Sequence, residues 1–349
     1  MIVNRCKNNP IIKPCDVKPS RPDFEVVCVF NAGVIRYMND VLLLLRVAEV
    51  PKNDNADKVF LAPMLDDKTN ELIVKSFDRT DKTIDFSDSR FIRTADDQFL
   101  TSISHFRIAR SKDGINFNVD EKPAMFPANQ YERFGIEDPR ITLIADTYYI
   151  NYSACSNITG VTTNLATTKD FVTFTRHGVI FTPDNKDIAI FPGKINGRYY
   201  ALNRPASAEY GMRDLWMSES PDLISWGNHK LIMRARDDMW DNGRIGCSAV
   251  PFKIDEGWLE IYHGATKDHR YCLGAALFDL DDPTKVLARS TEPIIQPEKS
   301  YEKIGFFDDV IFSCGVLFED GIVKIYYGAA DTCICYAEIT LEEILKNLA

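Results

Sequence analysis

Short apolar runs alternate with tight polar turns along most of the chain. The segment 33–47 (GVIRYMNDVLLLLRV) places two apolar strands on either side of a turn at Asn39-Asp40. Five further segments repeat this pattern, at 90–117, 140–154, 192–205, 250–265 and 315–330. Polar or glycine-containing turn pairs between alternating strands are a strong hairpin signal. The pattern therefore predicts an all-β chain.

A second repeat accompanies the hairpins. The segments 109–117 (ARSKDGINF), 166–174 (ATTKDFVTF) and 218–226 (SESPDLISW) share small residues, an aspartate and a following aromatic residue. Each would follow the third strand of its unit and lead into an outer strand. Self-similarity at about 45 to 60 residues in an all-β chain is typical of a β-propeller. We count six units, but strands from both chain ends often complete one blade, so six units need not give six blades.

No Gly/Ser-rich linker separates the units, so residues 1–349 are predicted to form a single domain. Residues 1–24 are predicted to be an extended arm that packs on this domain. Such an arm also suits contacts between subunits, so a homo-oligomer is one expectation. Helical periodicity is convincing only over 340–348, where Leu341, Ile344, Leu345 and Leu348 share a face.

Composition and charge narrow the range of ligands. Apolar residues make up 45% of the chain and charged residues 26%, as in globular proteins. The net charge of −10 argues against nucleic acid and against anionic membranes as partners. A small anionic ligand would therefore need a local cluster of Arg and Lys side chains.

The nine cysteines include no CxxC pair, so the sequence indicates neither a zinc site nor a disulfide framework. Reduced thiols in the cytoplasm are the expectation. The first 25 residues lack a hydrophobic signal core, and the longest apolar run, 41–45, is too short to span a bilayer.

Polar residues recur at equivalent places in the predicted repeats. One set precedes inner strands, namely Asn31, Arg90, Asp138 and Asp309, and another ends second strands, namely Arg46, Arg204, His263 and Asp331. In a propeller such positions face the central axis, and polar residues clustered there form a pocket. The recurrence predicts one ring of charge around one cavity.

The strongest catalytic candidate is Asp138, within Glu137-Asp138-Pro139-Arg140. Pro139 would hold the neighbouring carboxylates rigidly, and an acid catalyst needs a raised pKa, from burial or a nearby negative charge. The alternative is a strand-entry turn in which Asp138 caps backbone amides.

Other polar candidates have structural alternatives of their own. His263 ends an apolar strand and could be a core residue, and Arg46, Arg204 and Arg244 could each simply pair with a carboxylate. The sequence contains no P-loop, GxGxxG, HExxH or GxSxG motif, so nucleotide-dependent and serine-hydrolase chemistry have no support.

Longer matching segments run through the chain in order: FNAGV (30–34), LLLLRVAE (42–49), FGIEDPRIT (134–142), NKDIAIFPGKINGRYYALNRP (185–205), SESPDLISWG (218–227), GWLEIYHGA (257–265), LGAALFDLDDPTKVLAR (273–289) and YYGAADT (326–332). In these segments the chain resembles glycoside hydrolase family 130, the mannoside phosphorylases and related mannosidases. The resemblance is strongest to the β-1,2-mannobiose phosphorylases of that family. It implies a five-bladed β-propeller, with our sixth unit completing the first blade.

The resemblance also implies roles for individual residues. Asp138 matches the general acid, which in this family is thought to relay its proton through a mannose hydroxyl. Asn31, Arg46 and Asp331 match residues that hold the mannose to be transferred, and Arg90 is placed with them by its position in the repeats. A basic cluster matches the phosphate site: Lys186, Arg204, Arg244 and His263.

These roles predict inverting phosphorolysis of β-1,2-mannobiose or short β-1,2-oligomannosides, reversibly giving α-mannose 1-phosphate and mannose. Phosphate is the co-substrate, and no metal or organic cofactor is implied. Phosphate is already nucleophilic at neutral pH and needs a cationic cradle rather than a general base. The alternatives are an inverting β-mannosidase, which would need a second carboxylate, a phosphorylase of β-1,4-mannosides, and a sugar-binding propeller without activity.

Four departures from the family pattern bear on the substrate, of which two lie at Cys247-Ser248-Ala249 and in the loop 155–160. Asn203 stands where many relatives have histidine, and Gly193 replaces a usual glutamate. None of the four removes the predicted acid or the basic cluster. All bear on the site of the leaving sugar, so the sequence does not define the precise substrate.

Overall fold

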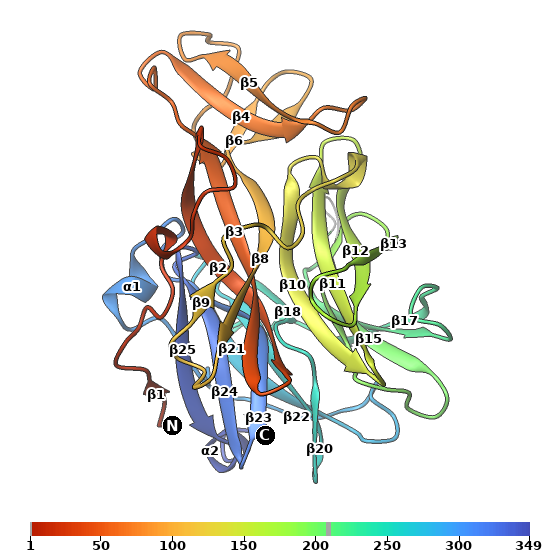
Figure 1. Cartoon of the computed structure of the whole chain (residues 1–349). Coiled ribbons are helices and arrows are strands. Elements are labelled where there is room, and N and C mark those ends of the chain that lie inside the picture. The colour runs from red at the N-terminus through yellow and green to blue at the C-terminus, as the bar shows by residue number, and fades with distance from the viewer. Residues whose placement is uncertain (1, 207–210) are drawn as a thin grey trace.

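The computed structural model describes residues 2–206 and 211–349, and it is built almost entirely of antiparallel strands (Figure 1). The all-β prediction is therefore confirmed. Turn chemistry accounts for the hairpins. At Asp320-Gly321, between β23 (Ile311–Glu319) and β24 (Ile322–Ala329), both φ angles are positive, at 52° and 75°. Such a two-residue turn matches the twist of the strands that it joins.

The strands form five groups of four or more. The first contains β2 (Phe24–Tyr37), β3 (Asp40–Pro51), β8 (Ile103–Ser111) and β9 (Asn118–Val119), and the second contains β10 (Gly135–Ile144), β11 (Thr147–Ser156), β12 (Gly160–Thr168) and β13 (Thr175–Phe181). The third is β14 (Asn185–Ile190), β15 (Tyr199–Pro205), β16 (Leu215–Ser220) and β17 (Gly227–Met233). The fourth is β18 (Arg244–Cys247), β19 (Phe252–Ile254), β20 (Gly257–Ala265), β21 (Tyr271–Phe278) and β22 (Val286–Arg289). The fifth joins β1 (Asn4–Arg5) to β25 (Cys333–Thr340), β24 and β23.

Successive groups touch one another, and the last touches the first. A parallel bridge between Gly135 and Ser104 links the first two groups into one sheet. A second parallel bridge, between Tyr271 and Val310, links the fourth group to the fifth. β23 lies so close to β2 that a side chain at Gly315 would come within 2.5 Å of Val34. The innermost strands at the two ends of the series are therefore neighbours.

The assignment of the six sequence units needs a correction. The segment 90–117, which we counted as a unit, supplies only β8 and β9 to the first group. The sixth unit does not complete the first group, because it forms a group of its own with β1. β1 pairs with β25 through Asn4 and Arg5.

The second repeat has one structure in all three copies, at the predicted places between β8 and β9, β12 and β13, and β16 and β17. The hydroxyl two residues before the aspartate accepts the backbone N–H three residues on, at 2.8 to 2.9 Å for Ser111, Thr168 and Ser220. The aspartate two residues after each hydroxyl accepts two further backbone N–H groups. Local side-chain bonds of this kind fix a turn without outside support.

A segment between β3 and β8 stands apart from the body, at the top of Figure 1. It contains two small hairpins, β4 (Val59–Leu65) with β5 (Leu72–Asp78), and β6 (Phe91–Arg93) with β7 (Gln98–Leu100). Its buried residues Ala62, Met64, Ile92 and Phe99 pack with Phe134 of the body. We call residues 52–102 the insert.

Both chain ends pack on the fifth group. The arm packs on the fifth group, where Ile12 is buried and pairs with Ile334. The C-terminal helix α2 (Leu341–Leu345) is shorter than predicted, but Leu341, Ile344, Leu345 and Leu348 do face the core. The remaining helical turns are η1 (Pro14–Asp16), η2 (Gln130–Glu132) and α1 (Ser300–Lys303). No helix in the described residues is long and apolar enough to cross a bilayer.

Replacing Asn9 by Ala should destabilise the protein. The Asn9 amide acts as a strand partner for β25, because its Nδ2 donates to the Tyr336 carbonyl at 2.9 Å and its Oδ1 accepts from the Tyr336 N–H at 2.8 Å. Loss of both bonds should lower the free energy of unfolding by about 1–3 kcal/mol, measured by denaturant titration. The neighbouring Asn8→Ala, which changes an exposed side chain, is the control, and an equal effect of both changes would refute the role of Asn9.

Candidate active site

Three inner strands carry a β-bulge at the same place. The register shifts after Phe30 in β2, after Glu137 in β10 and after Lys186 in β14. The residues that follow, Asn31, Asp138 and Asp187, have φ angles of 47°, 51° and 54°. Asn and Asp tolerate this left-handed conformation better than other side chains with a Cβ.

The bulges bring residues from different groups into contact. Asn31 and Asp138 are both 4% exposed, and Asn31 Nδ2 donates to Asp138 Oδ1 at 2.9 Å. In the strands next to β2 and β14, a basic side chain lies opposite the residue just before the bulge. In the fourth group it lies opposite the corresponding residue of β18. Arg46 lies opposite Phe30, Arg204 opposite Lys186, and His263 opposite Gly246. Strand register therefore gathers the predicted ring of polar groups.

A cavity of about 310 Å³ opens at this place. Seven of the nine predicted site residues line it: Asn31, Arg46, Arg90, Asp138, Lys186, Arg244 and Asp331. Sequence reasoning assigned no binding role to Glu137 or to the aromatic and small residues that complete the wall, which are Phe30, Phe91, Leu100, Ser102, Tyr271, Phe306, Phe307, Val310 and Phe312. Asp309 is exposed and does not line the cavity, so its assignment to the ring of charge is wrong.

Arg46 organises the acidic side of the cavity. Its Nη1 lies 2.9 Å from Asp138 Oδ1 and its Nη2 lies 2.6 Å from Glu137 Oε1. Its guanidinium also lies over the Phe30 ring, with Cζ 4.4 Å from the ring centre. One arginine thus fixes two adjacent carboxylates in a partly apolar setting. Arg46 does pair with carboxylates, as its structural alternative expects, but the partners are Glu137 and Asp138 of the cavity. The nearby Glu49 instead accepts from Ser20 and pairs with His105.

The protonation states differ from the expectation of a raised pKa at Asp138. Burial favours a raised value, but Arg46, Lys186 and the Asn31 amide outweigh it and hold the pKa of Asp138 below its ordinary value. Asp331 behaves oppositely. Burial and the charges of Asp138 and Glu137 raise the pKa of Asp331 to about 6, against the pull of Arg46 and Lys186. Asp331 therefore holds a proton more readily than Asp138 does.

The basic side of the cavity has two layers. Lys186 and Arg244 line the cavity, while Arg204 and His263 are buried with the carboxylate of Asp187. Arg204 Nη2 lies 2.6 Å from Asp187 Oδ2, and His263 Nε2 lies 3.5 Å from the same oxygen. The Asp187 carboxylate, opposed by burial, holds the pKa of Lys186 above its ordinary value.

His263 is not a cation at neutral pH, contrary to its place in a basic cluster. Burial lowers its pKa to about 3, and Arg204, Arg140 and Lys186 add to this effect against the attraction of Asp187. It can serve an anion only as a neutral hydrogen-bond donor.

Asp187, behind the cavity wall, is a further residue to which sequence reasoning assigned no role. Its signal was present, because extending the equivalence of Asn31 and Asp138 to the next inner strand leads to the aspartate after Lys186.

Arg90 is more exposed than Asn31 and Arg46, two of the other predicted mannose ligands. Its side chain is 42% exposed and forms a bidentate pair with Asp88, with Nε at 3.0 Å and Nη2 at 2.8 Å from the two carboxylate oxygens. It lines the cavity from the insert.

The departures from the family pattern at Asn203 and Gly193 lie outside the cavity wall. Asn203 is buried and its Nδ2 donates to Ser218 Oγ at 2.7 Å. A side chain at Gly193 would extend into open space. Neither change alters the polar groups described above.

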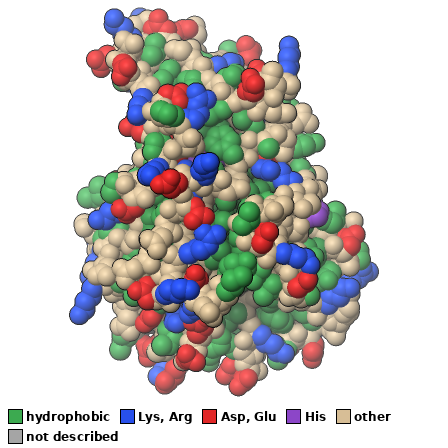
Figure 2. All heavy atoms as spheres, viewed as in Figure 1, with side chains coloured by type: hydrophobic (Ala, Val, Ile, Leu, Met, Phe, Trp, Pro, Cys, Tyr) green, Lys and Arg blue, Asp and Glu red, His purple; other side chains and the backbone are tan. Residues whose placement is uncertain are grey.

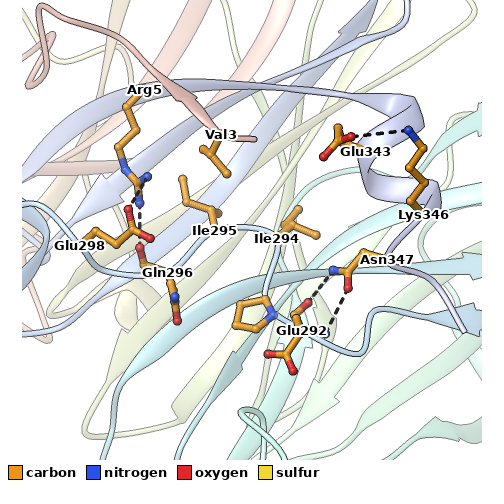
Figure 3. A pocket seen from close by; sticks show the side chains of 11 residues that line it. Val3, Arg5, Glu292, Ile294, Ile295, Gln296, Glu298, Glu343, Lys346 and Asn347 are labelled. Atoms are coloured by element: carbon orange, nitrogen blue, oxygen red, sulfur yellow. Dashed lines mark hydrogen bonds and ion pairs between the residues drawn. The ribbon is translucent and has the colours of Figure 1, made fainter. Parts of the chain in front are cut away.

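A second cavity, of about 370 Å³, lies beside the N-terminal arm (Figure 3). Most of its charged side chains are paired, since Arg5 pairs with Glu298 and Glu302, and Lys346 with Glu343. Over the outer surface, acidic and basic side chains are interspersed on the face shown in Figure 2. The convergent, partly buried charges that chemistry requires are therefore those around Asp138.

Comparisons with known proteins agree with the sequence motifs. A family model described as beta-1,4-mannooligosaccharide phosphorylase matches residues 91–349. The whole chain is 49% identical to a β-1,2-mannobiose phosphorylase of Listeria innocua, 99% of which is covered. Over 67% of this chain and 73% of the relative, it is 34% identical to a β-1,4-mannooligosaccharide phosphorylase of Ruminococcus albus.

A solved structure extends this likeness to three dimensions. The Listeria innocua β-1,2-mannobiose phosphorylase, in complex with β-1,2-mannobiose, matches with a TM-score of 0.95 at 48% identity, over 99% of each chain. Together with the match of the family model over most of its length, this shows that the chain belongs to glycoside hydrolase family 130.

Proposed function

We propose that the protein catalyses the inverting, reversible phosphorolysis of β-1,2-mannobiose or short β-1,2-oligomannosides, giving α-D-mannose 1-phosphate and mannose. The observation that carries the proposal is the pair Lys186 and Arg244, which face the cavity that also holds Asp138. A cationic wall beside an acid suits an anionic nucleophile. The likeness to a β-1,2-mannobiose phosphorylase along the whole chain supports the linkage.

The transferred mannose would bind at the acidic side, to Asn31, Arg46 and Asp331. Phosphate would bind at the basic side, to Lys186 and Arg244, with Arg204 and the neutral His263 behind them. Phosphate needs no general base, only charge compensation and an oxygen aimed at the anomeric carbon. These contacts require no metal or organic cofactor.

Asp138 would supply the proton of the departing sugar, through a mannose hydroxyl. Its low pKa has to rise for this step. Arrival of phosphate would do so, because the anion engages Lys186, one of the charges that stabilises the Asp138 carboxylate. The reaction is balanced in protons, since hydrogen phosphate brings the proton that the leaving sugar finally carries. Binding of the nucleophile and readiness of the acid would therefore be linked.

A β-1,4-mannoside phosphorylase is the second candidate, because the matching family model and the Ruminococcus albus relative both carry that description.

We also propose that the five strand groups are five propeller blades of one catalytic domain. The contact between β2 and β23 supports this closure. The nine cysteines are free, which suits the cytoplasm.

The function is tested by incubating the purified protein with β-1,2-mannobiose, with and without inorganic phosphate, and following the products by NMR. Phosphate-dependent α-mannose 1-phosphate is expected, and its anomeric signal reports inversion directly. Free mannose released at the same rate without phosphate would instead identify a hydrolase. Absence of turnover with β-1,2-mannobiose but turnover of β-1,4-mannobiose would identify the second candidate.

Asp138→Asn should reduce kcat by about 10²- to 10⁴-fold, the usual contribution of a positioned acid, while mannobiose still binds. Kinetics and calorimetric titration would separate the two effects. Asp309→Asn is the matched control, because Asp309 has the same left-handed backbone, with φ at 56°, but an exposed side chain outside the cavity. Normal turnover of Asp138→Asn would disprove the mechanism.

The raised pKa of Asp331 predicts a pH-dependent cost of folding. Below its ordinary pKa of 3.8 the carboxyl is protonated in both states, and between there and about 6 only the folded state keeps the proton. Stability should therefore fall as pH rises through this window, by at most about 3 kcal/mol. Asp331→Asn removes the titration, so its unfolding free energy relative to wild type should increase from pH 5 to pH 7. A difference that is independent of pH would contradict this.

A further inference from the structure

The open end of the cavity is built by two segments that are far apart in the sequence. The insert contributes Phe91 and Leu100, which pair across the β6–β7 hairpin. The segment between α1 and β23 contributes Phe306 and Phe307. The inner strands β2 and β10, which supply Asn31 and Asp138, lie at the opposite end.

Arg90 connects the two segments. Asp88 orients its guanidinium through the bidentate pair described above, and Cζ of Arg90 lies 5.1 Å from the ring centre of Phe307 and 5.3 Å from that of Phe91. A guanidinium within about 6 Å of an aromatic ring is attracted to its face. Arg90 therefore fastens the ring of Phe307 to the insert.

The small core of the insert holds Phe91 and Leu100 in place at the open end of the cavity. The neighbours of Phe91 and Leu100 in the hairpin, Ile92 and Phe99, are 0% and 3% exposed and belong to the separate core of the insert. That core also contacts Phe134 of the body. Phe91 is thus held at a fixed place relative to the cavity.

The exposed fractions of the lining residues distinguish a buried inner end of the cavity from an outer end that is open to solvent. Asn31 and Asp138 at its inner end are 4% exposed, while Phe306 at its outer end is 41% exposed. An oligomannoside that gives up its terminal mannose beside Asp138 must direct the rest of the chain toward the open end. The sugar next to the broken bond then lies against the aromatic wall.

We propose that Phe91 and Phe307, joined by Arg90, form the binding wall for the leaving sugar and so select the acceptor in the reverse reaction. This inference rests on the proposed phosphorolysis. The C–H faces of a pyranose pack on aromatic rings, and phenylalanine offers apolar area without hydrogen bonds. Arg90 then acts through Phe307 as a positioning residue, instead of binding the transferred mannose as the sequence predicts.

The reverse reaction provides a test that separates the two sugar sites. With α-mannose 1-phosphate as donor and mannose as acceptor, KM for the donor reports the inner end and KM for mannose reports the outer wall. Phe307→Leu, which removes the ring, should raise KM for mannose about fivefold to tenfold and leave KM for the donor unchanged. Phe307→Tyr, which keeps the ring, should restore KM for mannose to near the wild-type value.

Arg90→Ala should raise KM for mannose about threefold to fivefold, as expected for loss of a cation–π contact, and should add little once Phe307 is Leu. Arg79→Ala is the matched control. Arg79 lies in the same insert with Cζ 4.1 Å from the Phe60 ring centre, away from the cavity. Melting temperatures of all variants would be measured to identify general unfolding of the insert.

Each result bears on one of the two proposals. If wild type does not make mannobiose from α-mannose 1-phosphate, the proposed function fails. If wild type is active but Phe307→Leu leaves KM for mannose unchanged, the wall is wrong. An equal rise of both KM values in Arg90→Ala would also overturn the inference, because Arg90 would then contact the transferred mannose.

Discussion

The arrangement of the site depends on compensation of the buried charge of Asp187. Its carboxylate lies with Arg204 and His263, while Arg140 Nη2 is 3.6 Å away and Lys186 adds a further charge. Burial favours the neutral acid, yet the charges of Arg204, Lys186 and Arg140 hold the pKa of Asp187 far below its ordinary value. A buried ion survives only with such partners, and removal of one partner typically costs about 3–5 kcal/mol. The basic residues on the phosphate side of the cavity are therefore held in place by Asp187, and removal of one of them should destabilise the protein.

Arg140 connects the buried charge of Asp187 to the fourth strand group and to the bulge at Asp138. Its Nε and Nη2 donate to the carbonyls of Ser248 and Cys247 in the fourth strand group, at 2.7 and 2.9 Å, and its Nη1 donates to the carbonyl of Asp138 at 3.2 Å. The bulge that presents the acid is thus tied to the charges that would hold phosphate. This shared support explains how a residue with a left-handed backbone can remain in a rigid position.

The inner and outer ends of the cavity are stabilised by different means. The inner end uses buried ion pairs, which impose geometry and set protonation states. The outer end uses aromatic rings and the exposed Arg90 on an insert with its own small core. Substitutions at the outer wall can therefore change the sugar accepted there without disturbing the charge network around Asp187. This separation offers a physical route by which one family scaffold can serve several mannoside linkages.

The sequence by itself determined the local structure and most of the site. Alternating strands and Asp-Gly or Asn-Gly turns act over a few residues, so hairpins, the repeated turns after β8, β12 and β16, and the family motifs could be recognised without coordinates. The register of long-range pairs could not. It decides that β8 completes the first group, that Asp187 joins Arg204 and His263, and that Arg90 stands at the open end. Protonation was decided by tertiary structure too, because the pKa values of Asp138 and Asp331 depend on burial and on charges from strands distant in sequence.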